Sequence, residues 1–559
     1  MTAAVTPQRE QQLAAREAQS RSIIRRVGST ALAVPAGLFA VGLVTRILTG
    51  WLIHFPASEG SAYYVAVARN LVGGRGFEID AIWSYATPPL TLPRPAFELW
   101  QPLASVLAAA PMTVLGPTFD AAQLGFALLG AFLGPLAWLV ARDAARRLSL
   151  DPRRTASVAL GAGVLSAVSG PLLLSSVIPD STLPFTIAAV GACLLMPRAM
   201  TGDPRALAGL GTLLGVAYLV RMEAVYLGAT FFLLALAGGG ARRAIGLAAA
   251  VATVGGLVAA PWWLRNLSVF GTPMPGQLAD NAFLTANEQI FAYAERPSLE
   301  AFLAQGVDGL ASNVGVAAWH NLVDVLIVPG GIAAALGLLA VAIALGRRRG
   351  RTWLKSPLGA LMVAGSLTFA ATTVLFPVAT LWGTFEHASG PLVVGLIVAA
   401  LVAADAVVAR IRAWRDWPRS NAWLAPAALV ALTLPVAASL VIGASASALS
   451  SQALMAEMAT RLPPVLASAG VSAGSPLISD RPIWLSDALD WPVIALPAEE
   501  PAQLLDLAAD FGAQAVVVIE RRGEFPAALR APGVSDCFGE VHGQAADAPA
   551  VFVIEEACR

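Results

Sequence analysis

Apolar residues along this 559-residue chain gather in long runs separated by short polar stretches. Most runs are roughly 18 to 24 residues long, the length that an α-helix needs to cross a bilayer core of about 30 Å. The pattern therefore predicts an α-helical polytopic membrane protein with about eleven spanning helices. The predicted spans are 29–53, 119–141, 156–174, 181–197, 205–220, 223–237, 243–264, 323–346, 356–376, 391–409 and 422–446.

The arginines test this count, because Lys and Arg favour cytoplasmic loops. Five Arg-rich clusters lie between the runs, at 142–154, 198–205, 242–243, 347–355 and 410–419. All five fall on the cytoplasmic side only if the further apolar stretch 101–117 does not cross. That stretch contains Pro102 and Pro111 and would form a helix of only about 25 Å. We therefore predict that it is a juxtamembrane or half-inserted helix in the outer leaflet.

This topology places the N-terminus in the cytoplasm and the C-terminus outside. The predicted parts are a cytoplasmic segment (1–28), a transmembrane domain (29–447) with outer loops 54–118 and 265–322, and an outer domain (448–559). In the outer domain, short apolar runs at 515–519 and 551–554 are typical of strands, and 499–511 has a helical pattern. We therefore expect a small extracytoplasmic α/β domain.

Composition agrees with a membrane protein and narrows the chemistry. Hydrophobic residues make up 57% of the chain and charged residues 13%, whereas an ordinary soluble domain has about 25% charged residues. The net charge is zero, so no excess positive charge suggests nucleic acid as a partner. The sequence shows no metal-ligand spacing of Cys and His, no phosphate-binding P-loop and no nucleophile-elbow motif. The chemistry must therefore come from ionisable residues at the outer ends of the spans.

The first outer loop offers such a residue. Glu59 lies just beyond the first predicted span, and residues 61–72 have helical spacing that stops at Gly73-Gly74. A carboxylate followed by an interfacial helix suits a site where a lipid-borne substrate meets water. The alternative is a carboxylate that is merely solvated at a helix end.

Five segments, in order along most of the chain, carry a family resemblance. They are Glu59 with Tyr64, Ala68, Leu71 and Gly74; Glu98–Leu103; Leu219–Glu223; Pro261–Asn266 with Phe270–Pro273; and Leu477–Asp480 with Val493–Pro497. Together they resemble GT-C glycosyltransferases, membrane enzymes that use polyprenyl-phosphate sugars. This superfamily includes the protein mannosyltransferases of family 39 and the aminoarabinose transferases of lipid A.

The resemblance implies catalytic acids but leaves their identity open. The family usually has Asp four residues before the tyrosine that aligns with Tyr64, and this position is Gly60 here. The candidates are therefore Glu59, Glu98 and Asp180. In some members an acid at the place of Asp180 helps to bind a metal or the donor; the alternative is that Asp180 caps the helix that follows it.

A lipid-phosphate leaving group requires cations near the developing negative charge, and Arg binds phosphate with its fork of donors. Arg221 and Arg265, with the adjacent Asn266, are the predicted phosphate-binding residues. The alternative for both arginines is snorkelling towards the interface. Further candidates for donor or acceptor contacts are Tyr63, Tyr64, Glu223, Glu386 and His387; the alternative for Glu223 is an ion pair with Arg221.

The resemblance thus implies a glycosyltransferase on the outer face of a bacterial inner membrane. Its partners would be the bilayer, a polyprenyl-phosphate-linked sugar and a lipid, glycan or protein acceptor, with a divalent metal left open as cofactor. One alternative is a transporter or lipid flippase, although transporters tend to place ionisable residues at mid-membrane on broken helices. A catalytically inactive relative is the other alternative, because of Gly60.

The cysteines give an independent prediction. Of the three in the chain, Cys193 lies in a predicted span, and Cys537 and Cys558 lie in the outer domain. Two cysteines in one small domain that faces an oxidising compartment are expected to pair. We therefore predict a Cys537–Cys558 disulfide.

Overall fold

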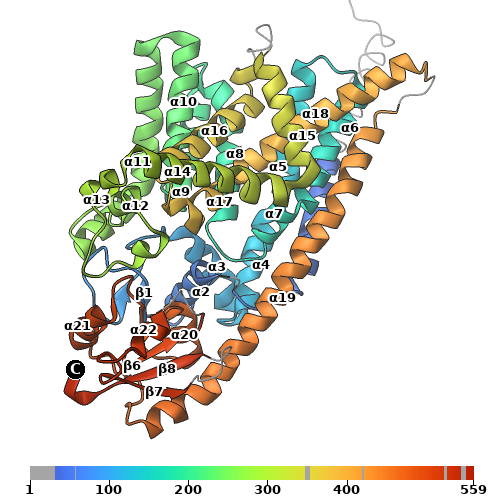
Figure 1. The fold of residues 1–559 in the computed structure, drawn as a ribbon. Helices are drawn as coiled ribbons and strands as arrows, with labels where there is room; N and C mark the ends of the chain where they lie inside the picture. Colours follow the sequence, from blue (N-terminus) through green and yellow to red (C-terminus); the bar gives the residue numbers. More distant parts are fainter. Residues whose placement is uncertain are drawn as a thin grey trace, which may run out of the picture.

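The computed structural model describes residues 32–56, 58–346, 353–417, 421–520, 525–542 and 549–558. The predicted cytoplasmic segment 1–28 lies outside the described residues. A helical bundle forms one end of the molecule, and a small domain with a mixed sheet forms the other (Figure 1). The predicted fold class, a helical membrane protein with a small C-terminal α/β domain, is confirmed.

Eight helical segments among the described residues are long and apolar enough to cross a membrane. They are Leu32–Gly50, Phe119–Arg147, Thr182–Ala199, Ala241–Phe270, Gly306–Gly346, Pro357–Leu375, Gly390–Trp414 and Leu424–Ser468. The other predicted spans are shorter helices: α6 (Pro152–Val168), α9 (Pro204–Tyr218) and α10 (Ala224–Gly239). Every predicted span thus has a helix, while the count of eleven crossings stays a prediction.

Several of the long segments are interrupted. The helices that compose the bundle are α4 (Phe119–Gly130), α5 (Leu133–Arg147), α7 (Gly170–Leu174), α8 (Thr182–Ala199), α11 (Ala241–Phe270), α14 (Gly306–Trp319), α15 (Val328–Gly346), α16 (Pro357–Leu375), α18 (Gly390–Trp414) and α19 (Leu424–Ser468), with the π-helical turn η2 (His320–Ile327) before α15. Their starts follow local chemistry: Asp151, Asp203 and Ser356 each accept a backbone N–H bond directly before a helix that begins with proline.

The described Arg-rich turns meet at one end of the bundle, opposite the C-terminal domain (Figure 1). Arg243 at the start of α11 donates to the carbonyl of Met200 at the end of α8 (3.0 Å). Arg154 near the start of α6 pairs with the buried Asp405 of α18 (2.6 Å). Arg347–Arg349, Arg351 and Arg419 lie outside the described residues. This common end is the arrangement that the positive-inside argument requires, and its assignment to the cytoplasm stays a prediction.

The stretch 101–117 forms α3 (Leu103–Leu115), a helix of 13 residues. A helix of this length rises only about 20 Å, less than a bilayer core. Ser105 of α3 donates to the carbonyl of Tyr64 (2.8 Å), and the N–H of Leu103 donates to the carbonyl of Leu219 (3.0 Å). The helix is therefore fastened to the end of the bundle nearer the C-terminal domain, and the prediction that it does not cross stays a prediction.

The C-terminal domain contains a six-stranded sheet in the order β2-β5-β4-β6-β8-β7. Its strands are β2 (Ala81–Ile82), β4 (Leu477–Ser479), β5 (Val493–Ala495), β6 (Ala515–Val518), β7 (Phe538–His542) and β8 (Ala550–Ile554). The strands β2, β5, β4 and β6 are mutually parallel, and β8 is antiparallel to both of its neighbours, β6 and β7. The helices α20 (Pro482–Leu489), α21 (Pro501–Phe511) and α22 (Phe525–Leu529) connect them.

Two features of this domain differ from the sequence-based expectation. The helix α19 runs without a break through residue 447, where the domain boundary was predicted, and ends only at Ser468. The edge strand β2 comes from the first outer loop and pairs with β5. The outer domain is therefore built from the C-terminal chain and part of that loop.

Short elements fill the space between the bundle and the sheet domain (Figure 1). They are α2 (Glu59–Val72), β1 (Glu78–Ile79), β3 (Arg94–Pro95), α12 (Leu278–Ala282), η1 (Asn287–Phe291), α13 (Leu299–Ala304), η4 (Ala379–Trp382), α17 (Thr384–Ala388) and, at the C-terminal end, η5 (Glu556–Cys558). The predicted helix 61–72 is confirmed, with Gly73 at its C-terminal cap.

Candidate active site

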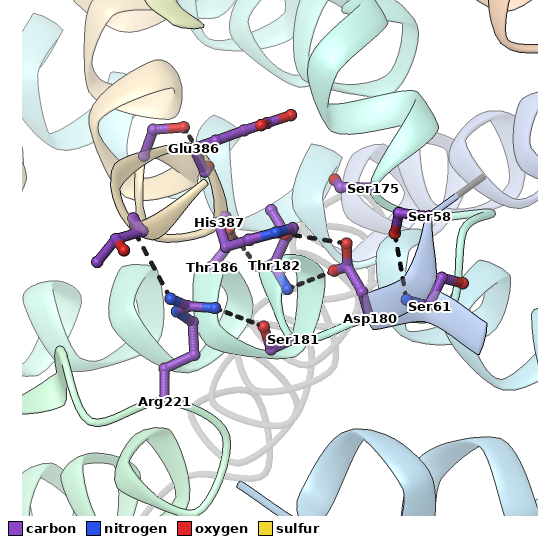
Figure 2. A network of polar contacts seen from close by, with 12 residues as sticks. Ser58, Ser61, Ser175, Asp180, Ser181, Thr182, Thr186, Arg221, Glu386 and His387 are labelled. Carbon is purple, nitrogen blue, oxygen red and sulfur yellow. Dashed lines mark hydrogen bonds and ion pairs between the residues drawn. The ribbon is translucent and has the colours of Figure 1, made fainter. Parts of the chain in front are cut away.

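The polar centre of this region is the turn between α7 and α8. Asp180 is buried there, and its Oδ1 accepts the N–H bond of Thr182 (2.6 Å) at the start of α8. Nδ1 of His387 lies 3.4 Å from Oδ2 of Asp180 and 2.8 Å from Oγ1 of Thr182 (Figure 2). Asp180 therefore accepts the first N–H of α8 from the position before the N-cap residue Ser181, and it pairs with a histidine far along the chain.

Close helix packing brings His387 to this position. It lies on α17, directly before α18, and α18 begins at Gly390 against Thr186 of α8. A Cβ at Gly390 would lie 1.9 Å from Oγ1 of Thr186, so only glycine allows this approach. The start of α17 follows Gly383, whose φ of 95° also favours glycine.

The environment of each group favours the charged form of the pair. Burial works to raise the pKa of Asp180, but the hydrogen bond and charge of His387 and the hydrogen bonds of Thr182 outweigh it and hold the pKa below its ordinary value. Burial works to lower the pKa of His387, but Asp180 outweighs it and leaves the pKa raised. An anionic carboxylate and a cationic imidazole are therefore both favoured.

Arg221 extends this cluster from the turn between α9 and α10. Its guanidinium donates to Oγ of Ser181 (2.7 Å) and makes two hydrogen bonds to Glu223 (2.6 and 3.2 Å). One of its nitrogens also lies 3.5 Å from the carbonyl oxygen of Thr384 on α17. The predicted Arg221–Glu223 ion pair is confirmed, and it joins the α8, α10 and α17 ends around Asp180.

The helix α2 covers the cluster through Tyr64. The buried hydroxyl of Tyr64 lies within hydrogen-bonding reach of Ser181. Burial raises the pKa of this hydroxyl, while the charge of Arg221 works to lower it and the charge of Asp180 to raise it. The neighbouring Tyr63 belongs to a different cluster, where its hydroxyl donates to the buried Glu98 (3.3 Å). The two tyrosines thus connect α2 to two separate polar groups.

Glu98 is a structural acid in this second cluster. Its carboxylate lies 3.2 Å from the fully buried Arg94, which also donates to the carbonyl of Thr87 (2.7 Å) and to that of Ser84. These contacts hold the first outer loop together. The catalytic prediction for Glu98 remains untested, but its carboxylate is already committed to Arg94 and Tyr63.

Arg265 lies among three aromatic rings near the C-terminal end of α11. Its guanidinium carbon is 4.8 Å from the ring centre of Trp262, 5.1 Å from that of Phe270 and 5.9 Å from that of Phe77. Its guanidinium donates to the side chain of Asn266 (3.2 Å), which in turn donates to the carbonyl of Pro273 (3.3 Å). Within the described residues Arg265 forms no ion pair, so its charge is available to an anion.

Glu59 has a place that the sequence did not suggest. Its two carboxylate oxygens accept the N–H bonds of Ile483 and Trp484 (2.9 Å each) at the start of α20 in the C-terminal domain. An acid at a helix N-terminus is favourable for both the orphan N–H groups and the helix dipole. The contact favours a docking role for Glu59, and its predicted catalytic role remains untested.

The structure therefore brings together Asp180, His387, Arg221, Glu223 and Tyr64. Glu386 is exposed, and its charge acts on the neighbouring His387 (Figure 2). The sequence analysis did not single out Ser181 and Thr182. Both follow Asp180 at a helix start, and such an Asp-Ser-Thr run is a signal that could have identified them.

The donor atoms around Asp180 do not suit a divalent cation. Magnesium and calcium sites use several oxygen ligands, but Asp180 is the cluster's only carboxylate without an arginine partner, and it faces the cationic His387. The described part of the chain holds no group of three or more His, Cys, Asp or Glu side chains placed to bind a metal.

No protein-family model matches the chain, and no curated protein matches it. Solved structures do. The archaeal oligosaccharyltransferase AglB from Archaeoglobus fulgidus, in complex with an inhibitory peptide and a dolichol-phosphate, matches with a TM-score of 0.54 at 13% identity, over 94% of this chain and 74% of that one. ArnT from Cupriavidus metallidurans in the apo state matches with a TM-score of 0.50 at 14% identity, over 96% and 99%. These likenesses establish that the chain shares the fold of AglB and ArnT.

Proposed function

We propose that this protein is a glycosyltransferase that moves a sugar from a polyprenyl-phosphate donor to an acceptor on the outer face of a bacterial inner membrane. The observation that carries the proposal is the buried Asp180–His387 pair beside Arg221, at the end of the bundle that faces the C-terminal domain. An ionised carboxylate at the outer ends of spanning helices suits the place where a lipid-borne donor meets a polar acceptor. The neighbour AglB was solved with a dolichol-phosphate, which supports a lipid phosphate as part of the donor.

The proposed reaction is a displacement at the anomeric carbon. The acceptor oxygen or nitrogen forms a bond to that carbon while the bond from the carbon to the phosphate oxygen breaks. Asp180 orients the acceptor and takes its proton as the new bond forms, and the leaving group is the polyprenyl phosphate. The low pKa of Asp180 makes it a weak base, so its main contribution is to orient the acceptor and stabilise positive charge at the sugar ring.

The test is incubation of the purified protein with a panel of polyprenyl-phosphate sugars, with release of lipid phosphate as the readout. Asp180→Asn should lower the rate by about 10²–10⁴-fold, the usual cost of losing a positioned acid or base. The matched control is Asp308→Asn, because Asp308 is exposed on α14. If no donor in the panel releases lipid phosphate, or if Asp180→Asn keeps the full rate, the proposed function fails.

Arg265 is the proposed phosphate ligand, because its guanidinium contacts aromatic rings, the side chain of Asn266 and the carbonyl of Phe77, but pairs with no carboxylate among the described residues. Arg265→Ala should raise the KM for the lipid-phosphate donor. Arg265→Lys should recover only part of this loss, since an ammonium lacks the fork of donors and the flat face that lies against Trp262. Equal kinetics for Lys and Arg would show that charge alone matters there.

A further inference from the structure

The proposed displacement at the anomeric carbon gives no step to His387, the histidine that lies against the carboxylate of Asp180 where a cation would otherwise meet it. Nδ1 of His387 is 3.4 Å from Asp180 and 2.8 Å from Thr182, and Thr182 also donates its N–H to Asp180. One threonine thus fixes both members of the pair. The imidazole is part of a built arrangement of three side chains from α8 and α17 (Figure 2).

The other carboxylates near this end of the bundle are committed elsewhere. Glu223 makes a two-bond pair with Arg221, Glu98 contacts Arg94, and Glu59 receives two N–H bonds from α20. Glu386 is exposed, and none of the described contacts joins its carboxylate to Asp180. A divalent cation at Asp180 would therefore find a single carboxylate and a neighbouring positive charge, which disfavours its binding.

The first outer loop leaves space for a second carboxylate but does not supply one. Gly60 lies one helical turn before Tyr64, on the face of α2 whose Tyr64 reaches Ser181. A Cβ at Gly60 would meet only Oγ of Ser58, at 3.9 Å, and its backbone is not in the left-handed region. Nothing in the local geometry requires glycine here, so an acid could be accommodated.

We propose that the imidazolium of His387 supplies at Asp180 the positive charge that a bound divalent cation would supply, so that transfer needs no metal. This inference rests on the proposed function for its kinetic consequence. The imidazolium neutralises Asp180 before the acceptor arrives: Nδ1 lies 3.4 Å from the carboxylate and is held there by its hydrogen bond to the hydroxyl of Thr182 (2.8 Å). This pairing keeps the carboxylate ionised and oriented. His387 acts through Asp180 and is therefore a positioning residue.

The experiment compares wild-type protein with His387→Gln, Gly60→Asp/His387→Gln and the control Gly60→Asn/His387→Gln, each with EDTA or with Mn²⁺. Glutamine keeps a hydrogen-bond donor near Thr182 but removes the charge. Wild-type transfer should be the same in EDTA and Mn²⁺, and His387→Gln should be slower by roughly 10²-fold in both, the usual cost of losing one electrostatic group. Mn²⁺ should restore part of the rate only in the variant with the second carboxylate.

Thermal unfolding gives a readout that does not depend on activity. Mn²⁺ should leave the Tm of the wild type unchanged and raise that of Gly60→Asp/His387→Gln, but not that of the Asn control. This measurement separates the metal-free inference from the proposed glycosyl transfer. Even if the protein transfers none of the sugars tested, the Tm shows whether Asp180 binds a metal. The inference is overturned if EDTA abolishes wild-type transfer, if Mn²⁺ raises the wild-type Tm, if His387→Gln keeps its full rate, or if Mn²⁺ has no effect on the variant with the second carboxylate.

Discussion

His387 is the side chain whose charge should make the protein sensitive to pH. The charged groups that face it are Asp180 before α8, Arg221 from the turn before α10, and Glu386 on its own helix. Among them Asp180 dominates, and the pKa of His387 is raised above its ordinary value of about 6.5. The carboxyl of Asp180 has a lowered pKa. The ion pair therefore exists between the lowered pKa of Asp180 and the raised pKa of His387.

We predict that transfer is lost as the pH rises through the raised pKa of His387. The same deprotonation removes the stability that the pair contributes, which is fully present below about pH 6.5 and above the ordinary Asp pKa of about 3.9. The measurement is the pH dependence of kcat, with His387→Gln as the comparison. The alkaline fall should be absent in the variant, and identical profiles for the two proteins would refute the assignment.

Glu59 is the residue for which the structure changes the expected outcome of a mutation. Glu59→Gln replaces one of two acceptor oxygens with an N–H₂ group that faces backbone N–H donors. A buried donor without an acceptor costs about 1–3 kcal/mol, so the Tm should fall while kcat at low temperature stays close to normal. Glu300→Gln, on the exposed surface of α13, is the matched control. A loss of about 10²-fold in rate with an unchanged Tm would instead restore Glu59 as the base.

The sequence predicted contacts between neighbours in the chain and missed those between distant residues. The Asp180–Thr182 hydrogen bond and the Arg221–Glu223 pair connect residues two positions apart, so spacing alone indicates them. The bonds from Glu59 to α20 connect residues more than 420 positions apart. Their existence depends on how the C-terminal domain sits on the first loop, and no local pattern encodes that. Arg46, fully buried in the first helix, was missed for the same reason, because one of its nitrogens donates to the carbonyl of Ala167 (3.4 Å), 121 positions away.

At the scale of elements, the runs of apolar residues predicted the positions of the long helices well. The predicted spans 181–197, 356–376 and 391–409 correspond to α8, α16 and α18 within a few residues at most boundaries. In a long apolar helix many residues indicate the same structure, whereas β2 has only two residues, too few to form a recognisable pattern. The π-helical turn η2 reads as ordinary helix in the sequence, because its residues have the same apolar spacing. Such elements are set by their tertiary neighbours.

The helix α3 provides the topological test. A helix of 13 residues is too short to cross the bilayer core, so its two ends should lie on the same side of the membrane. We predict that a reporter fused after Gly116 is on the outer side and that a reporter fused after Arg154 is in the cytoplasm. A reporter active in the cytoplasm after Gly116 would show that α3 crosses, and every later span would then reverse.

At the scale of the whole molecule, both outer loops are fastened to the C-terminal domain. The first loop contributes β2, the Glu59 bonds, an Arg69–Asp487 ion pair and a hydrogen bond from the Tyr85 hydroxyl to Ala495. The second loop contributes the N–H groups of residues 293–295, all bonded to Glu499. These contacts place the C-terminal domain over the end of the bundle that carries Asp180. They explain why a domain boundary inferred from hydropathy alone fell inside a continuous helix.

The predicted location of this domain outside the cytoplasm leads to the last prediction, which concerns its cysteines. Cys537 lies directly before β7 and Cys558 in η5 after β8. These strands are antiparallel neighbours in which Phe538 faces Ile554, so the sheet itself brings the two ends together. The structure joins Cys537 and Cys558 in a disulfide with their Cα atoms 5.6 Å apart, inside the usual limit of about 7 Å.

This bond would persist only in an oxidising compartment. Detecting it would therefore support both the predicted outer location of the domain and the pairing of β7 with β8. Closing a loop over a sequence separation of 21 residues contributes about 3 kcal/mol in the loop-entropy model, and reduction should therefore lower the Tm. Thiol labelling of the denatured, unreduced protein should find one reactive cysteine, Cys193, which is a buried free thiol in the folded protein. After reduction, all three should react. Three reactive thiols before reduction would contradict the disulfide, and they would also remove this support for placing the C-terminal domain outside.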